Sequence, residues 1–254
     1  MTELPEGYRV VIFDEVGSTN TLALEMAREG EASGLWVMGR RQLAGKGRQG
    51  RAWMSEKGNL YVSLLLRNPA PMSRLGNLPL VVALAVHDAI ADVLPPFARA
   101  PLEIKWPNDI LYDGAKICGI LIEGAHQAEG QVVVIGIGIN CRHHPEGTPY
   151  PAADLAGLGY PVEPDDLLPV LAARMKQRLD AWRDGSFAPL REAWLARARG
   201  VGETITVRMP NGTREGVFDG LDADGRLLLR AGGQVEAISA GDVFFGGMGG
   251  KAGR

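Results

Sequence analysis

The sequence predicts an α+β protein, in which a mixed β-sheet packed with helices is followed by a small SH3-like β-barrel. Three observations predict it. Apolar strand-like runs alternate with segments of helical period between residues 8 and 198. After Gly200, short β-rich runs are separated by Asn-Gly, Asp-Gly and Gly-Gly pairs, which are hairpin-turn signals. Finally, 254 residues, of which 46% are hydrophobic and 22% charged, can hold one large domain and a small appendage.

The first third of the chain combines strands with a capped helix. Residues 8–13 alternate like a strand, and residues 35–38 and 59–66 are strand-like as well. The tripeptide Ser-Thr-Asn at 18–20 is typical of a helix N-cap, because short polar side chains accept hydrogen bonds from the free N–H groups of the first turn. We therefore expect a helix that begins at this tripeptide, between the first two strands.

The most apolar segment, residues 78–94, predicts a buried helix. Pro79 stands at its start, where a missing N–H costs little. His87, Asp88 and Asp92 interrupt the apolar run, so we expect a core helix and not a membrane span.

The middle of the chain continues the sheet and ends in helices. The run 131–140 is nearly continuous in apolar residues, which is typical of a central strand covered on both faces. Residues 143–164 are rich in Pro, Gly and Ala and predict a loop. The predicted strands are 102–106, 117–123 and 131–140, and the predicted helices are 165–182 and 189–198.

The sequence pattern changes at Gly200 from long helical and strand-like segments to short β-rich runs, which predicts a domain boundary. We expect a first domain over residues 1–200, a second over 201–246, and a flexible glycine-rich tail over 247–254.

Composition excludes several classes of function. The net charge of −3 gives no general attraction to nucleic acid, and the first residues lack the apolar region of a secretory signal. Cys118 and Cys141 lie in apolar runs and are expected to be reduced core thiols. These observations predict a cytoplasmic protein without nucleic-acid or membrane partners.

The most informative segment is Gly-Lys-Gly-Arg-Gln-Gly-Arg at 45–51. Glycine lets the backbone approach a ligand closely, and the cations add charge suited to phosphate. Residues 45–50 match the G-x-G-x-x-G dinucleotide fingerprint, but a strand-like run follows where that motif needs a helix, and no carboxylate lies near position 70. We therefore expect a loop that closes over a polyphosphate, although a solvated basic loop is the alternative.

Two further segments carry candidate site residues. Lys-Trp-Pro-Asn-Asp at 105–109 is by itself typical of a turn with a buried tryptophan. Lys116 begins an apolar strand, where a buried ammonium group needs an anionic partner such as a bound carboxylate or phosphate. Gly136 and Gly138 predict that a ligand or another backbone approaches a central strand closely, and Asn140 at its end offers both a donor and an acceptor. A packing pair of glycines followed by a turn asparagine is the alternative.

Taken together, these segments resemble the biotin protein ligases, the biotin–[acetyl-CoA-carboxylase] ligases. The resemblance covers the chain from about residue 8 to residue 245. It depends on five motifs in the same order: Val-Gly-Ser-Thr-Asn at 16–20, Gln42 with the basic loop through Trp53, Lys-Trp-Pro-Asn-Asp at 105–109, Lys-Ile-Cys-Gly-Ile-Leu at 116–121, and Gly-Ile-Gly-Ile-Asn at 136–140.

The resemblance implies a role for each matched residue. Catalytic roles fall to Lys116, Arg48 and Asp109, and Asp109 orients the site, binds Mg²⁺ or contacts the incoming lysine. The implied biotin-binding residues are Ser18, Thr19, Asn20, Gln42, Lys46, Gly47, Arg48 and Lys116. The implied ATP- or adenylate-binding residues are Gly45, Arg51, Trp53, Asn108 and Asn140. Lys46 stands where the family usually has an arginine, so the charge is kept but the bidentate guanidinium group is absent.

The resemblance also implies the reaction and its partners. ATP, with Mg²⁺, and biotin would form biotinyl-5′-AMP, and biotin would then pass to a lysine on the biotin carboxyl carrier domain of acetyl-CoA carboxylase or a related carboxylase. Only 17 residues precede Ser18, too few for the DNA-binding domain of bifunctional members, so we expect no repressor activity. A monomer and a homodimer are both compatible with the family. A lipoate or octanoate protein ligase is the alternative enzyme, and an SH3-like binding module or a nucleic-acid contact is the alternative of another class.

Overall fold

The larger part of the protein is built on a seven-stranded mixed sheet. The computed structural model describes residues 3–127, 130–148 and 150–246. The strand order is β1-β2-β3-β7-β6-β5-β4, and among these pairs only β1 and β2 run parallel. The strands are β1 (Arg9–Phe13), β2 (Leu35–Gly39), β3 (Leu60–Arg67), β4 (Leu102–Lys105), β5 (Asp109–Tyr112), β6 (Ala115–Gln127) and β7 (Gly130–Ile139).

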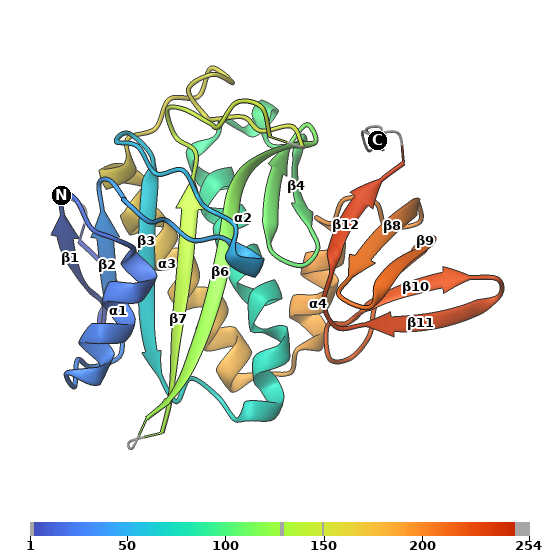
Figure 1. The fold of residues 1–254 in the computed structure, drawn as a ribbon, viewed down its shortest axis with the longest axis horizontal. Coiled ribbons are helices and arrows are strands. Elements are labelled where there is room, and N and C mark those ends of the chain that lie inside the picture. Colours follow the sequence, from blue (N-terminus) through green and yellow to red (C-terminus); the bar gives the residue numbers. More distant parts are fainter. Residues whose placement is uncertain (1–2, 128–129, 149, 247–254) are drawn as a thin grey trace.

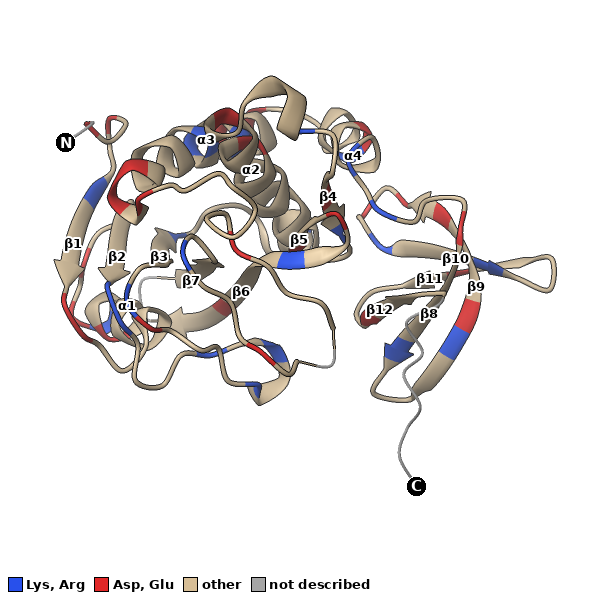
Figure 2. Ribbon diagram, turned by 90° about the horizontal axis from the view of Figure 1, so that it is seen from above, with Lys and Arg blue, Asp and Glu red and all other residues tan. Residues whose placement is uncertain are grey.

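Helices cover this sheet unequally on its two faces. They are α1 (Thr19–Arg28), α2 (Leu78–Val93), α3 (Pro164–Asp184) and α4 (Ala188–Leu195). In Figures 1 and 2, α2 and α3 pack on one face, whereas α1 and the segment between β2 and β3 lie on the other. On this second face, α1 and the segment between β2 and β3 therefore cover the central strands together.

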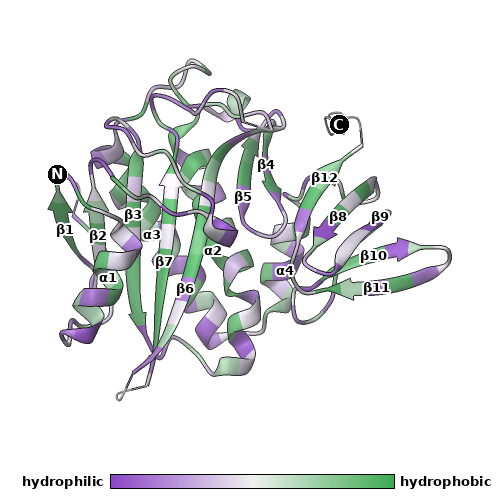
Figure 3. Ribbon diagram, viewed as in Figure 1, coloured by the Kyte–Doolittle hydropathy of each residue, from purple (hydrophilic) through white to green (hydrophobic). Residues whose placement is uncertain are grey.

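The apolar segments form the core between the sheet and the helices. The central strands β3 and β7 are buried along most of their length, and both stand out as hydrophobic in Figure 3. The stretch Met72–Val93 has the length and composition of a membrane span, but 67% of its apolar window is buried inside the protein. The prediction of a core helix at this position is confirmed.

The sequence located most elements but missed one strand and one contact. Strand β5 was not predicted, because residues 105–109 were interpreted as a turn and only three residues follow before the next turn. Ser18 is the N-cap residue of α1, as predicted, but its side chain makes no capping hydrogen bond. That part of the prediction is wrong, since the N–H of Thr19 instead donates to Gln42 Oε1 over 2.9 Å.

The C-terminal part forms a second, antiparallel sheet. Its strands are β8 (Thr204–Met209), β9 (Gly212–Leu221), β10 (Leu227–Ala231), β11 (Gln234–Ile238) and β12 (Asp242–Phe245). The order is β11-β10-β9-β8-β12, so among the described residues the two edge strands do not pair and the barrel is not closed. Gly232 and Gly233 both have positive φ, +56° and +80°, as the predicted two-residue hairpin turn requires. The predicted flexible tail, 247–254, lies outside the described residues.

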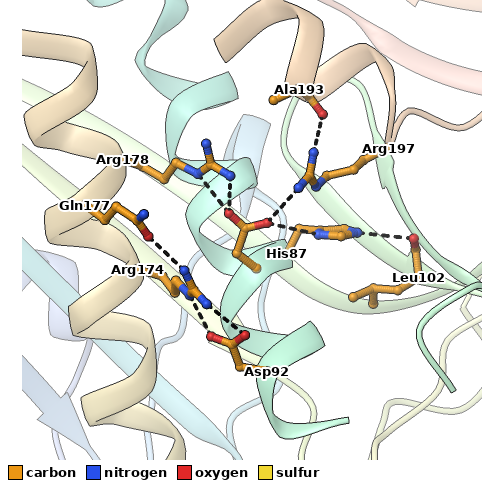
Figure 4. A network of polar contacts seen from close by, with 9 residues as sticks. His87, Asp92, Leu102, Arg174, Gln177, Arg178, Ala193 and Arg197 are labelled. Carbon is orange, nitrogen blue, oxygen red and sulfur yellow. Dashed lines mark hydrogen bonds and ion pairs between the residues drawn. The ribbon is translucent and has the colours of Figure 1, made fainter. Parts of the chain in front are cut away.

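An ion-pair network fixes the helices behind the sheet (Figure 4). Asp88 of α2 contacts Arg178 of α3 at 2.5 Å and Arg197, just beyond α4, at 3.4 Å. His87 joins α2 to β4 through the carbonyl of Leu102, 3.2 Å away. Burial alone would raise the pKa of the Asp88 carboxyl, but hydrogen bonds from His87 and Arg178 and the charges of both arginines outweigh it and hold that pKa below its usual range.

Replacing Asp88 by asparagine is expected to lower the free energy of unfolding by about 2–3 kcal/mol at neutral pH, because two guanidinium groups lose an anionic partner that is nearly buried. Since the folded pKa lies below the unfolded one, this stabilisation is present above about pH 4 and disappears as pH falls through the folded pKa. Urea unfolding at a series of pH values measures both effects, and the gap between wild type and variant should shrink in acid.

Asp92→Asn is the matched control. Asp92 lies on the same helix and pairs with Arg174 of α3, but both side chains are about one-third exposed. Exposed pairs contribute less than about 1 kcal/mol, so this variant should unfold near wild type. Equal losses for the two variants would contradict a special role of the Asp88 network.

Candidate active site

Glycines open the α1 face of the sheet at its centre. The register places Ser63, Gly136 and Leu121 in one row across β3, β7 and β6, and Gly138 and Gly119 in the next row of the same face. A Cβ atom on Gly136 would lie 2.2 Å from Asn20 Oδ1, and one on Gly138 would lie 2.5 Å from Trp53 Nε1. A close approach is present at both glycines, but the approaching groups are two side chains of this chain, where a ligand or another backbone was expected.

Trp53 lies flat against the second row. A Cβ on Gly119 would also meet its ring, at 2.8 Å, so both glycines are needed to seat the indole. The backbone of the basic loop holds the residue in place, because Trp53 N donates to the carbonyl of Gly45 over 2.9 Å. The indole therefore forms a wall between the loop and the sheet.

A connected set of polar groups lines the N-terminal end of α1. Gln42 Oε1 accepts from Thr19 N at 2.9 Å and from Thr19 Oγ1 at 3.0 Å, and Gln42 Nε2 donates to Ser55 Oγ at 2.9 Å. Ser18, Thr19 and Asn20 are all at most 5% exposed. Buried polar groups with fixed partners can distinguish donors from acceptors on a small ligand.

Lys116 stands further along the sheet. Its Nζ forms an ion pair with Asp109 Oδ1 at 2.7 Å, and both side chains are less than one-fifth exposed. The ammonium also lies 5.3 Å from the ring centroid of Trp53 and 5.6 Å from that of Tyr150. The anionic partner that we expected of a ligand is therefore supplied in this structure by Asp109.

The basic loop reaches from the large sheet to the C-terminal one. Arg48 donates to Asn108 Oδ1 at 2.7 Å and to the carbonyl of Gly241 at 3.1 Å. Arg51 pairs with Asp242 at 2.8 Å, and Lys46 donates to Thr21 Oγ1 of α1 at 2.8 Å. These contacts hold the loop to α1 on one side of the hollow and to the C-terminal part of the protein on the other.

These groups enclose a hollow of about 80 Å³. Four cationic side chains and two carboxylates line it, which favours an anionic ligand. The cations are Lys46, Arg48, Arg51 and Lys116, and the carboxylates are Asp109 and Asp242.

All predicted site residues except Gly45 and Asn140 line this hollow. Gly45 packs under its own loop, where a Cβ would lie 2.3 Å from the carbonyl oxygen of Trp53. Asn140 instead secures the segment after β7, because its Nδ2 donates to the carbonyl of Ala153 at 3.0 Å. Tyr150 and Asp242 line the hollow but were not predicted, since each lies in a segment without a recognisable motif.

A second, smaller hollow of about 40 Å³ adjoins the first and shares the Lys116–Asp109 pair and Tyr150 with it. Its other walls are largely apolar and include Leu111 and the edge of the C-terminal sheet at Phe244. Burial lowers the pKa of the Lys105 ammonium group in this wall, and the nearby charge of Lys116 lowers it too, against the charge of Asp109. Lys105 lies 5.7 Å from the ring centroid of Phe244.

The two cysteines lie in the core, and the magnesium contact of Asp109 stays a prediction. Cys118 and Cys141 are free and buried, and burial raises the pKa of the Cys141 thiol to about 12, so both are inert core residues. No group of three His, Cys, Asp or Glu side chains is arranged to hold a metal in the described part of the chain. A magnesium ion here would be held mainly by phosphate oxygens and water, with Asp109 or Asp242 as a protein ligand.

Two family models match the chain. The Biotin/lipoate A/B protein ligase family matches residues 12–140, and the Biotin protein ligase C terminal domain matches residues 200–246. The first match covers the predicted site residues of the large sheet, and the second covers Gly241 and Asp242.

Relatives and solved structures agree with these models. A biotin–[acetyl-CoA-carboxylase] ligase of Paracoccus denitrificans is 40% identical over 91% of this chain and 98% of its own. The bifunctional ligase/repressor BirA of Bacillus subtilis is 32% identical over 94% of this chain and 75% of its own. The biotin protein ligase of Aquifex aeolicus in complex with biotin and ATP superposes with a TM-score of 0.79, at 27% identity, over 93% of this chain and 97% of its own. The resemblance indicated by the five motifs is confirmed.

Proposed function

The chain belongs to the biotin/lipoate A/B protein ligase family, and we propose that its hollow joins biotin to AMP and then to a lysine of a biotin carboxyl carrier domain. It is an ATP-dependent biotin–[acetyl-CoA-carboxylase] ligase. The roles of individual residues described below are our proposals.

One observation carries the choice of acid. The lining of the hollow has the buried polar groups of Thr19, Asn20 and Gln42 near the row of Gly136, and it has Lys116 beside Gly119 in the next row. Leu121 and Lys116 are five residues apart on β6, roughly 16 Å at the usual rise of a strand. Lys116 folds back toward Gly119, where a Cβ would lie 3.3 Å from its Cε. An acid with a compact polar head and an apolar chain fits this order, and biotin has this form.

In the first step, a carboxylate oxygen of biotin attacks the α-phosphorus of ATP, and the bond to pyrophosphate breaks. Lys116 holds the two negatively charged reactants together, and Arg48 and Arg51 neutralise charge that develops on the phosphate oxygens. ATP enters with its Mg²⁺, which supplies further charge on the phosphates. The ring of Trp53 covers the chain of the acid or the adenine, and that of Tyr150 faces Lys116 from another side.

In the second step, the lysine amine of the carrier, in its neutral form, attacks the acyl carbon, and the bond between that carbon and the AMP oxygen breaks. The proton that the nitrogen loses passes to solvent. We propose that this lysine enters through the second hollow, because its walls are largely apolar and Asp109 lies at its junction with the first. An alkyl chain with a charged end group suits such a passage. Asp109 then orients the amine when Lys116 is engaged with the adenylate.

The experiment that tests the function is pyrophosphate exchange into ATP. We expect exchange that depends on biotin and that lipoate does not support. Transfer of biotin to a carrier domain should follow when that domain is added. Exchange with lipoate but not with biotin would overturn the proposal in favour of the alternative ligase.

The remaining predictions concern organisation. We propose a catalytic domain over residues 1–200 and a C-terminal domain over residues 201–246. Three further points stay predictions: the carrier domain as the partner, a monomer or homodimer, and a cytoplasmic location.

Lys46 stands in place of the arginine that is usual in the family. It donates to Thr21, whereas Arg48 makes the contacts to Asn108 and Gly241.

A further inference from the structure

Ser63 is a buried polar residue in the middle of an apolar strand. Its neighbours in β3, from Leu60 to Leu66, are otherwise apolar, and its own exposed fraction is 0%. A hydroxyl placed there must be satisfied inside the protein. Ser63 Oγ lies 2.6 Å from Asn20 Oδ1 and 2.8 Å from Thr19 Oγ1. Ser63 therefore contacts two residues of the proposed biotin pocket from beneath.

Glu123 contacts the same amide from the opposite side. Asn20 Nδ2 donates to Glu123 Oε2 at 2.7 Å and to the carbonyl of Leu121 at 3.3 Å. Glu123 follows Leu121 by two residues on β6, so both side chains belong to the face of the sheet that carries α1. Glu123 is half-buried and lies outside the residues that line the hollow.

The three contacts fix the direction of the Asn20 amide. A carboxylate and a carbonyl only accept, so they require the NH₂ group on the side of Glu123, which leaves the amide oxygen toward Ser63. Asn20 Oδ1 can only accept as well, so the single proton of Ser63 is donated there. Gly136 beneath has no Cβ, and this lets the amide lie directly on the strand between the two partners.

The arrangement also constrains Thr19. The proton of the Thr19 hydroxyl has two acceptors within reach, Ser63 Oγ at 2.8 Å and Gln42 Oε1 at 3.0 Å. In either case its oxygen keeps a lone pair for a ligand N–H in the hollow. Thr19 and Asn20 thus each present an acceptor before the ligand arrives.

We propose that Ser63 and Glu123 are positioning residues for the polar head of the acid, which act by fixing Asn20 and Thr19 in one hydrogen-bonding pattern. The proposal rests on the function proposed above. The pattern is formed without the ligand, so binding does not have to orient these side chains. The ureido group of biotin has two N–H donors, and the free lone pairs of Thr19 and Asn20 are acceptors that suit such donors.

Ser63→Ala tests the first residue. We expect the KM for biotin in pyrophosphate exchange to rise about tenfold, which corresponds to about 1.4 kcal/mol, while kcat and the KM for ATP stay within twofold. Biotin alone, without ATP, should also raise the melting temperature of the variant less than that of the wild type. Val62→Ala is the matched control, because Val62 is the neighbouring buried residue and points to the opposite face.

A merely structural role for Ser63 would lower the melting temperature and leave the KM for biotin unchanged, as we expect of Val62→Ala. That result for Ser63→Ala would overturn the proposal. If the wild-type enzyme itself showed no biotin-dependent exchange, the proposed function would be overturned instead. The two failures can therefore be told apart.

Glu123 is tested by a pair of variants on a half-buried side chain, which should fold. Glu123→Gln keeps an oxygen that can accept from Asn20 Nδ2 and should stay within threefold of the wild-type KM for biotin. Glu123→Leu removes the acceptor and should raise that KM about tenfold. An equal rise of the KM for biotin in the two variants would contradict this positioning role, because the charge of Glu123 and not its hydrogen bond would then matter.

Discussion

Replacing Lys116 by glutamine is expected to lower biotin-dependent pyrophosphate exchange by a factor of about 10²–10³. Lys116 lines both hollows, and it can draw two negatively charged reactants together only while it carries its charge. Removal of one preorganised electrostatic contact from an active site typically costs about 2.7–4 kcal/mol in the transition state. The measurement is the rate of exchange at saturating biotin and ATP, so that weaker binding alone does not account for the loss.

The same substitution should leave the fold intact. Lys116 is near the start of β6, and its backbone bonds to Pro151 and Ala153 do not depend on the side chain. The ammonium group of Lys105 would remain as a positive charge near the Asp109 carboxylate. Thermal unfolding within a few degrees of wild type would separate loss of chemistry from loss of structure.

Lys176→Gln is the control for loss of a lysine as such. Lys176 lies on α3, is 41% exposed and pairs with Asp180 one turn later. An exposed pair of this kind contributes little, so exchange should stay within twofold of wild type. If Lys116→Gln exchanged as fast as this control, Lys116 would have no part in adenylate formation.

The sequence was most informative where function and local structure use the same few residues. The tripeptide at 18–20, the basic loop and Lys116 each combine an unusual residue with a recognisable place at the end or start of an element. Gly136 and Gly138 could be interpreted because a central strand seldom gives up two side chains without a close neighbour. The identity of that neighbour, Asn20 or Trp53, depends on how distant segments pack and could not be predicted.

Other site residues carry no local signal. Asp242 lies about 190 residues after Arg51, and only the position of the C-terminal sheet brings them together. Ser63 looks like an ordinary residue of an amphipathic or buried strand until its two partners on α1 are seen. Asn140 is a strand-end amide that also donates to the carbonyl of Ala153, a structural contact that its place in the sequence does not indicate. Residue type and spacing indicate which chemistry is available, whereas the fold decides which groups meet.

The second large effect is expected at Arg48. This side chain fastens the basic loop, because it donates to Asn108 of the large sheet and to Gly241 of the C-terminal sheet and lies 3.8 Å from Asp242. A loop held in this way can keep a hydrolysable acyl-adenylate away from water. Arg48→Gly removes all three contacts and gives the backbone more freedom.

We therefore expect Arg48→Gly to release biotinyl-5′-AMP about 100-fold faster than the wild type. Charge-assisted hydrogen bonds contribute about 1.5–3 kcal/mol each, so loss of the two of them is sufficient for this change. The released adenylate should biotinylate lysines of a bystander protein that has no carrier domain. Retention of labelled adenylate after rapid gel filtration measures the release directly.

Two aspartate variants test whether the contacts of the basic loop to the C-terminal sheet also retain the adenylate. Asp242→Asn weakens the pairs with Arg48 and Arg51 and should release the adenylate at a rate between those of wild type and Arg48→Gly. Asp219→Asn changes a partly exposed carboxylate of the same sheet that pairs with Arg230, and it should retain the adenylate like wild type. If Asp242→Asn also retained it fully while Arg48→Gly leaked, the contacts of Arg48 to Asn108 and Gly241 would hold the loop without Asp242. If neither variant leaked, the loop would not be a lid, and its cations would serve only to bind phosphate.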